Sequence, residues 1–460
     1  MVFSGTVFLL VFLPVTLLIY YILPHRARNA FLFAASLVFY AWGEPVYILI
    51  MLFSTVFDFA NGLLLERFEK KNNQGARKFI LALSVVVNLG LLCFFKYTNF
   101  AIESINSFTN AGIAALNVAL PVGISFYTFQ TLSYTIDVYR KKVKANHNIL
   151  DFGMYISMFP QLIAGPIVRY ASIEKQIKDR KTEADKILRG IFRFTVGLGK
   201  KVIIANNVGA LWEEISALEN PASATALIGA IAFALQIYFD FSGYSDMAIG
   251  LGKMLGFDIP ENFDYPYESK SVTEFWRRWH ISLGTWFREY LYIPLGGNRK
   301  GLPRQIINLL VVWFLTGLWH GAGWNFIIWG LYFFVLLVIE KLFLLRLLDK
   351  CPKIIARVYT LFAVLISWVI FASDSLSSAL GYLGALFGKN GFANGETLYF
   401  MKSYEIILVI GIIGSVSLVK RLAEKADKPP LRIILAAALY IISLILIVNG
   451  SYNPFLYFRF

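Results

Sequence analysis

The sequence predicts an all-α integral membrane protein, a helical bundle that crosses the bilayer about twelve times. Residues of the set AVILMFWYC make up 57% of the 460 positions and charged residues only 16%, whereas soluble globular proteins carry roughly 25% charge. The mean hydropathy is +0.61. Too few polar residues remain to coat the soluble domains that this length would otherwise predict. We therefore expect one membrane-embedded domain over residues 1–460, with its motifs concentrated at about 120–340.

The individual spans are predicted from apolar runs, since about 20 such residues cross the hydrocarbon core of a bilayer. In chain order the runs are 3–23, 31–42, 46–65, 79–97, 120–138, 202–211, 226–251, 306–318, 324–339, 355–371, 406–419 and 431–448. The runs at 31–42 and 202–211 are short. Residues 151–168 are apolar but interrupted by prolines and a glycine, which favours a re-entrant segment enclosed by protein. Residues 187–198 form either an in-plane amphipathic helix or an ordinary helix end anchored by lysines.

The net charge of +14 arises mainly in short loops between apolar runs, a pattern that sets membrane orientation. Loops with few or no basic residues, at 99–117 and 212–222, alternate with basic loops at 67–78, 140–144, 169–201, 341–357 and 420–432. This alternation predicts that the basic loops are cytoplasmic and that both termini are extracytoplasmic, with the first run retained as a span. Segment 371–402 is then the longest external connection, and we expect it to serve as a docking surface. No basic arm or nucleic-acid motif is present, so we expect no nucleic-acid partner.

One histidine stands out among the four in the sequence. His25 and His147 lie in loops beside charged residues and are predicted to be solvated. His320 lies between two apolar runs, where an ionisable group is costly and usually faces a cavity or a partner. Glycines at 317, 321 and 323 leave room either for a ligand or for close helix packing. With the histidines scattered and only Cys93 and Cys351 as cysteines, which we expect to be unpaired, we predict no metal site.

A second polar cluster lies in residues 275–297, which are rich in tryptophan. If residues 275–292 form one helix, Arg277, His280, Gly284 and Arg288 share a face at about 100° per residue. Arginine forks suit phosphate or carboxylate. The alternative is an interfacial helix with an aromatic belt and snorkelling arginines, which explains the tryptophans but explains His280 poorly.

Two carboxylates in the run at 226–251, Asp240 and Asp246, predict polar contacts within the bundle. They could pair with the arginines, and no spacing rule supports a catalytic acid–base pair. The sequence contains no GxSxG, HExxH, P-loop or dinucleotide motif.

These motifs, taken together and in this order, resemble the membrane-bound O-acyltransferase family, and most closely its bacterial alginate O-acetyltransferase branch. The resemblance covers nearly the whole chain and includes both chain ends. It is carried by residues 275–297, Trp319-His320-Gly321, Pro121-Val-Gly-Ile-Ser-Phe-Tyr-Thr-Phe129, Phe159-Pro-Gln-Leu-Ile-Ala-Gly-Pro-Ile167, residues 240–252, Met1-Val-Phe-Ser4 and Asn453-Pro-Phe-Leu-Tyr-Phe-Arg-Phe460.

The resemblance implies a helical bundle in which two funnels meet at a central tunnel. It implies that His320 is the catalytic histidine and His280 the second polar position. Arg277, Arg288, Trp319, Asp240, Asp246 and Gln161 are then expected to line the tunnel or contact substrate. The implied reaction moves an acetyl group from a cytoplasmic donor, acetyl-CoA or another acyl thioester, with no permanently bound cofactor.

The same resemblance implies a location in the bacterial inner or plasma membrane. It implies two partners: an extracytoplasmic protein resembling SGNH hydrolases, and a secreted or cell-surface polysaccharide as acceptor. The chemistry agrees, because histidine is a suitable base near neutral pH, and Trp319, Arg277 or glycine-rich backbone could stabilise an oxyanion.

Three alternatives stay open at this point. D-alanyl transfer to teichoic acid shares the core motifs. A glycan transporter or flippase predicts inverted repeats and paired broken helices, which the sequence does not show. A membrane scaffold that recruits an external enzyme leaves His320 and its glycines without a role.

Overall fold

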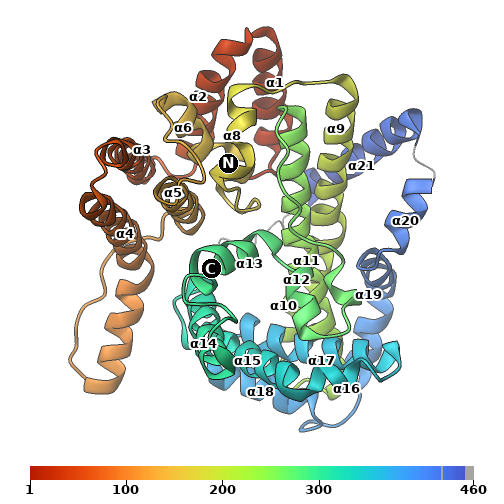
Figure 1. The fold of residues 1–460 in the computed structure, drawn as a ribbon. Coiled ribbons are helices and arrows are strands. Elements are labelled where there is room, and N and C mark those ends of the chain that lie inside the picture. Colours follow the sequence, from red (N-terminus) through yellow and green to blue (C-terminus); the bar gives the residue numbers. More distant parts are fainter. Residues whose placement is uncertain (426–427, 451–460) are drawn as a thin grey trace. The chain divides into compact units, whose positions relative to one another are not determined.

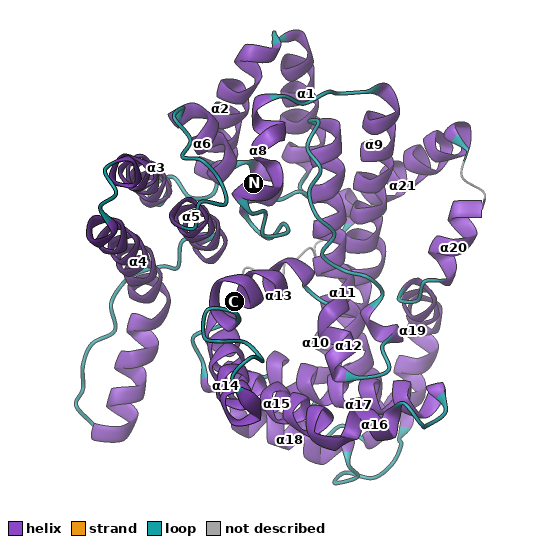
Figure 2. Cartoon of the chain, in the orientation of Figure 1, coloured by secondary structure: helices purple, strands orange, loops and turns teal. Residues whose placement is uncertain are grey.

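In a computed structural model, residues 1–425 and 428–450 are described, and their regular elements are helical, with no strand among them (Figure 2). The C-terminal motif Asn453–Phe460 and residues 426–427 of the basic loop at 420–432 lie outside the described residues. Contacts divide the chain into two compact units, Met1–Phe194 with Met247–Pro260, and Thr195–Asp246 with Glu261–Phe460.

The first unit is built mainly from eight α-helices that follow one another along the chain, together with the first residues of α9 and the last residues of α11 (Figure 1). The eight are α1 (Leu13–Ile22), α2 (Arg28–Ala41), α3 (Ile48–Lys70), α4 (Gln74–Thr109), α5 (Ile124–Tyr139), α6 (Ile149–Ser157), α7 (Phe159–Leu162) and α8 (Tyr170–Lys178). The π-helix η1 (Phe8–Phe12) leads into α1, and the 3₁₀-helix η2 (His25–Ala27) precedes α2.

The second unit contains most of α11 and the helices that follow it (Figure 1). Its elements are η3 (Lys200–Ala205), α10 (Asn206–Ser216), α11 (Ser223–Met254), η4 (Pro266–Glu268), α12 (Val272–Arg278), α13 (Ile281–Phe287), η5 (Arg288–Tyr292), α14 (Gly301–His320), α15 (Trp324–Ile339), η6 (Glu340–Leu344), α16 (Leu345–Leu348), α17 (Lys353–Ala372), α18 (Leu376–Leu386), α19 (Gly395–Gly414), α20 (Leu418–Lys425) and α21 (Pro429–Asn449).

The all-helical membrane architecture is confirmed, but the count of twelve spans is not. Among the described residues, eight helices are long and apolar enough to cross a bilayer, and two shorter apolar helices, Phe8–Ile22 and Leu376–Leu386, accompany them. The apolar windows of α19 and α21 are each only 17% buried within the protein, against 50% for α17. Because exposed apolar surface on this scale is not tolerated in water, we expect α19 and α21 to face the bilayer.

Two ambiguous segments of the sequence acquire definite structures. Residues 151–168 form α6, the short helix α7 and an irregular stretch in which nearly every residue is buried. Residues 187–198 belong to α9 (Ala184–Gly199), which continues into η3 and α10 with no intervening loop. Residues 187–198 are therefore part of a longer helical segment, and Lys201, only 3% exposed, is not a surface anchor.

The first unit buries a carboxylate among the helices α3, α4 and α5. Asp58 is fully buried and accepts hydrogen bonds from Ser84 Oγ at 2.6 Å, Asn88 Nδ2 at 2.6 Å and Thr135 Oγ1 at 3.2 Å. Intramembrane carboxylates are commonly functional, but here neutral donors satisfy both carboxylate oxygens. These bonds tie three helices together, which supports a structural role.

Candidate active site

The hairpin formed by α14 and α15 carries His320 at its turn. His320 is the last residue of α14, and α15 begins four positions later at Trp324. The two helices cross closely, because a Cβ added to Gly317 would collide with the carbonyl oxygen of Phe326, and one added to Gly330 with that of Trp313. Small residues permit such backbone contact between membrane helices. The crossing fixes the end of α14, and with it the position of His320.

His320 is only 7% exposed and lies among aromatic rings. Its ring centroid is 4.9 Å from that of Trp329, 5.0 Å from that of Trp319 and 5.4 Å from that of Phe371, all in edge-on arrangements. Such geometries are favourable for aromatic pairs. They also restrict rotation of the imidazole, so its orientation is set by packing.

The other two glycines of this motif serve packing as well. A Cβ on Gly321 would collide with the ring of Phe326, and a Cβ on Gly323 would lie 2.5 Å from Asn325 Oδ1. Asn325 Nδ2 in turn donates to the carbonyl of Ser373 at 2.9 Å, which fastens the start of α15 to the end of α17. Of the two roles that the sequence allowed for these glycines, the structure supports close packing.

The prediction of one helix over residues 275–292 is wrong. Helix α12 ends at Arg278, Trp279 is extended, and His280 adopts a left-handed conformation with φ of +46° before α13 begins at Ile281. The face that would have grouped His280 with Arg277 and Arg288 therefore does not exist. Tertiary hydrogen bonds to the preceding loop impose this break, and helical periodicity carries no information about them.

The tryptophans of this segment pack inward, so the interfacial aromatic belt is also wrong. Trp276 contacts Trp313, with ring centroids 4.7 Å apart, and Phe333, 4.9 Å away. Trp279, 3% exposed, lies 4.9 Å from Trp368. These contacts fasten α12 to α14, α15 and α17, the helices that surround His320.

The structure brings His280, Trp319 and His320 together. His280 is 1% exposed, and its ring lies 4.7 Å from that of Phe241 and 5.9 Å from that of Trp319, which in turn contacts His320 at 5.0 Å. Burial lowers the pKa of the His280 imidazole to about 3. His280 is therefore neutral near pH 7.

The two aspartates of α11 pair with lysines, so the idea that they pair with Arg277 or Arg288 is wrong. Asp240 Oδ1 lies 2.7 Å from Lys201 Nζ, and both side chains are 3% exposed. Asp246 Oδ2 lies 2.7 Å from Lys200 Nζ. Lys200 and Lys201 come close to α11 because Gly243 has no side chain. A Cβ at this position would lie 2.8 Å from the carbonyl oxygen of Gly197. Close packing here leaves both carboxylates with cationic partners.

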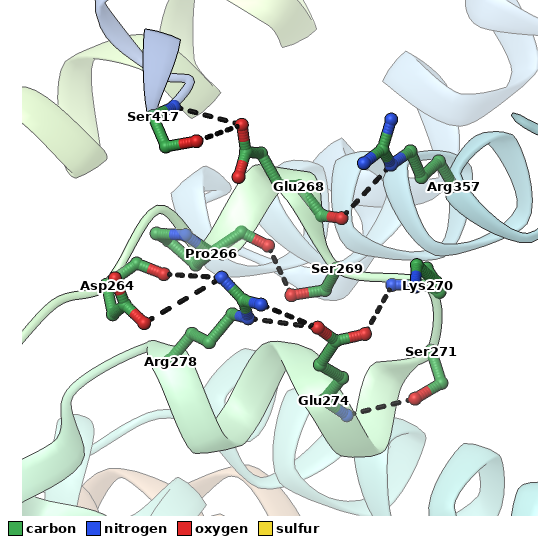
Figure 3. Close-up of polar contacts among 10 residues, drawn as sticks. All are labelled: Asp264, Pro266, Glu268, Ser269, Lys270, Ser271, Glu274, Arg278, Arg357 and Ser417. Carbon is green, nitrogen blue, oxygen red and sulfur yellow. Dashed lines mark hydrogen bonds and ion pairs between the residues drawn. The ribbon is translucent and has the colours of Figure 1, made fainter. Parts of the chain in front are cut away.

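Arg277 and Arg288 are exposed, and within the described part of the chain neither guanidinium has a hydrogen bond or ion pair. Their neighbour Arg278 holds the local structure instead (Figure 3). Arg278 Nη2 lies 2.8 Å from Glu274 Oε1, and Arg278 Nη1 lies 3.8 Å from Asp264 Oδ2. The exposed pair is thus available to a ligand, and Arg278 is structural.

The loop before α12 is also fastened to distant parts of the second unit, as Figure 3 shows. Glu268 accepts hydrogen bonds from the backbone N–H and the hydroxyl of Ser417, at 2.9 and 3.0 Å, while its own carbonyl accepts from Arg357 Nε at 3.3 Å. Lys270 N donates to Glu274 at 2.9 Å. The loop that leads to His280 is therefore held on several sides.

Sequence reasoning missed Glu340, a fully buried carboxylate in η6. Its Oε1 accepts from the backbone N–H of Val272 at 2.6 Å, and its Oε2 from the N–H and the hydroxyl of Thr273, at 2.8 and 2.6 Å. A carboxylate at a helix N-terminus satisfies orphan donors and interacts favourably with the helix dipole. Glu340 therefore caps α12 from a helix that follows His320. The available signal was an acidic residue at the end of an apolar run.

Gln161 belongs to the first unit, in α7, whereas the predicted site residues described above belong to the second. Its side chain is fully buried, and Nε2 donates to the carbonyl of Tyr155 at 2.5 Å. Its predicted role in substrate contact stays a prediction.

Comparison with known proteins adds an independent line of evidence. A model of the membrane-bound O-acyltransferase family matches residues 139–380, a stretch that contains both buried histidines. The chain is 45% identical over 391 residues to a probable alginate O-acetylase of Pseudomonas aeruginosa, covering 84% of this chain and 75% of that protein. It is 35% identical over 430 residues to a peptidoglycan O-acetyltransferase of Helicobacter pylori, covering 85% and 80%.

A more distant match extends over about half of the chain. A teichoic acid D-alanyltransferase of Bacillus subtilis is 29% identical over 233 residues, which is 48% of this chain and 59% of that protein.

Proposed function

Because the chain belongs to the membrane-bound O-acyltransferase family, we propose that it moves an acetyl group from a cytoplasmic acyl thioester across the membrane for O-acetylation of a secreted or cell-surface polysaccharide. The observation that carries this proposal is the pair of buried histidines joined through Trp319. Acetyl is favoured over D-alanyl because the relatives named as acetylating alginate or peptidoglycan match 84–85% of the chain, against 48% for the D-alanyltransferase.

The chemistry assigned to His320 is general base catalysis. An acceptor hydroxyl attacks the thioester carbonyl, a C–O bond forms, and the C–S bond breaks. His320 takes the hydroxyl proton and returns it to the departing thiolate, so no net proton is consumed. A positioned base of this kind contributes about 10²–10⁴-fold to a rate. The aromatic rings around His320 support the assignment, because they hold the imidazole in one orientation.

Trp319 and His280 are proposed to assist that step. The indole N–H of Trp319 is a hydrogen-bond donor without acceptor character, which suits stabilisation of the oxyanion that forms on the carbonyl. His280 is proposed to shape the acceptor path and to orient the hydroxyl or a water molecule. Asp240 and Asp246, held by Lys201 and Lys200, act by fixing α11 beside His280.

The donor is proposed to be acetyl-CoA, drawn in by basic cytoplasmic loops. We assign Arg277 and Arg288 to its phosphate groups. Both guanidiniums are exposed, and within the described residues neither makes a hydrogen bond or an ion pair. Replacing Arg288 with lysine keeps the charge but loses the planar fork. We expect a raised KM for the donor and a normally folded protein, measured by acetyl transfer at varied donor concentration.

The matched control for that substitution is Arg346→Lys, an exposed arginine in α16. It should leave the KM unchanged. If Arg288→Lys is as active as the wild type at every donor concentration, the arginine serves only as an interfacial anchor.

The membrane topology is proposed to include about twelve crossings, with helices shorter than the eight long spans contributing the remainder, and both termini extracytoplasmic. After replacement of the exposed Cys93 and Cys351, a cysteine at Glu214 should react with an impermeant thiol reagent added outside cells. A cysteine at Lys71 should react only after the membrane is opened. The opposite labelling pattern would refute the orientation.

The acceptor side is proposed to involve an extracytoplasmic partner that resembles SGNH hydrolases and places acetyl on polysaccharide hydroxyls. Segment 371–402, with α18 and the start of α19, is the proposed docking surface. The protein is proposed to act in the bacterial inner or plasma membrane.

Reconstitution tests the whole proposal. Purified protein in liposomes, given radiolabelled acetyl-CoA, should release CoA and label an acceptor oligosaccharide or the purified partner. D-alanyl thioester serves as the competing donor, and transport of unmodified glycan without acyl transfer would instead support a flippase. Acetyl turnover with no glycan transport is the expected result.

A further inference from the structure

Asn262 lies in the loop between α11 and α12, with its side chain fully buried beside His280. Its Oδ1 accepts hydrogen bonds from the backbone N–H of Ser282 at 3.1 Å and from Ser282 Oγ at 2.8 Å, while Nδ2 lies 3.3 Å from Ser245 Oγ. A backbone N–H can only donate, so the amide atom that faces Ser282 must be the oxygen. This contact settles the orientation of the Asn262 amide, which the shape of the side chain alone does not distinguish.

The same oxygen determines the protonation of His280. His280 Nδ1 lies 3.2 Å from Asn262 Oδ1. An amide oxygen has no proton to give, so Nδ1 must carry the hydrogen in this contact. A neutral imidazole has one N–H, and its other nitrogen then carries the lone pair. Neutral His280 is therefore the Nδ1–H tautomer, and Nε2 is its accepting atom.

We propose that Asn262 is a positioning residue for acyl transfer, which holds His280 in the Nδ1–H tautomer and so makes Nε2 the atom through which His280 accepts a hydrogen bond. The proposal deepens the function given above and rests on it for the role of His280, whereas the tautomer itself does not depend on that function. Neutral His280 cannot donate a proton from Nε2. Its part in the reaction is thus to accept a hydrogen bond from an acceptor hydroxyl or from a water molecule.

The backbone around His280 gives Asn262 a second task in the same arrangement. His280 has φ of +46°, a left-handed conformation that is strained for a non-glycine residue. The turn is held from the Asn262 loop, because Ile281 N donates to the Asn262 carbonyl at 3.0 Å and Asp264 N donates to the Arg278 carbonyl at 2.9 Å. The Asn262 side chain also caps the N-terminus of α13 through Ser282 N. One residue therefore fixes the backbone, the ring and the tautomer of His280.

The tautomer can be measured directly with histidine labelled by ¹⁵N in the full-length protein in lipid. The chain has only four histidines, and the His280 signals are those that disappear in His280→Gln. In the wild type we expect a protonated Nδ1 and an unprotonated Nε2. Asn262→Asp keeps an oxygen acceptor and should preserve this tautomer and most of kcat.

Asn262→Ala removes the acceptor, and should shift His280 toward the Nε2–H tautomer and lower kcat by about 10²-fold, with little change in the KM for acetyl-CoA. The proposal is overturned if wild-type His280 is protonated at Nε2, or if Asn262→Ala changes the tautomer without lowering kcat. If Asn262→Ala does not fold, the wild-type and Asn262→Asp spectra still decide the assignment. A wild-type protein with the expected spectrum but no acetyl transfer would instead contradict the proposed function.

Discussion

Replacing His320 with alanine is expected to abolish measurable acetyl transfer while the protein still inserts into the membrane and folds. The loss should reach about 10²–10⁴-fold, the usual contribution of a positioned base. Because the smaller alanine side chain would leave space among Trp319, Trp329 and Phe371, some loss of thermal stability should accompany it. His320→Gln fills more of that space without supplying a base of comparable strength, and should be equally inactive. Acetyl-CoA turnover by purified protein in liposomes measures the effect.

The control histidine is His147, which is exposed and lies 2.7 Å from Glu66. His147→Ala should retain wild-type turnover, whereas His280→Ala should lose activity to a smaller extent than His320→Ala. A correctly inserted His320→Gln protein that acetylates at a near-normal rate would refute the assignment of His320 as the base.

The sequence singled out His320 because an ionisable residue between apolar runs is informative wherever the chain folds. It also predicted the helical membrane class, since lipid permits only structures whose backbone hydrogen bonds are satisfied internally. Both inferences depend on properties of single segments. That explains why they did not require knowledge of which helices are neighbours.

The local arrangement around His280 could not be predicted in the same way. A helical wheel over residues 275–292 assumes an unbroken helix, but His280 bonds to Asn262, 18 positions earlier. The partners of Asp240 and Asp246 likewise come from η3, before α11 in the chain, and the cap on α12 comes from Glu340, 67 and 68 positions after the residues that it binds. Each contact joins segments that are distant in the sequence, so the periodicity within one segment cannot predict it.

Glu340 gives the second large effect, because both of its oxygens are needed. Oε1 accepts from Val272 N, and Oε2 accepts from Thr273 N and Thr273 Oγ1. Glutamine supplies only one amide oxygen. Its NH₂ group would face another hydrogen-bond donor, which would be left without an acceptor. We expect Glu340→Gln and Glu340→Ala to lower the melting temperature of the purified protein, since each buried donor left unsatisfied costs about 1–3 kcal/mol.

The same substitutions should reduce kcat, because α12 carries Trp276 against Trp313 and Phe333 and leads directly to His280. Thermal unfolding and acetyl turnover on the same samples measure both effects.

The control is Glu103→Ala, an exposed glutamate on α4, which should change neither. If Glu340→Gln unfolds at the wild-type temperature and turns over at the wild-type rate, the carboxylate does not hold α12. If only stability falls while kcat is unchanged, the cap stabilises the fold without positioning His280, and its link to the reaction is refuted.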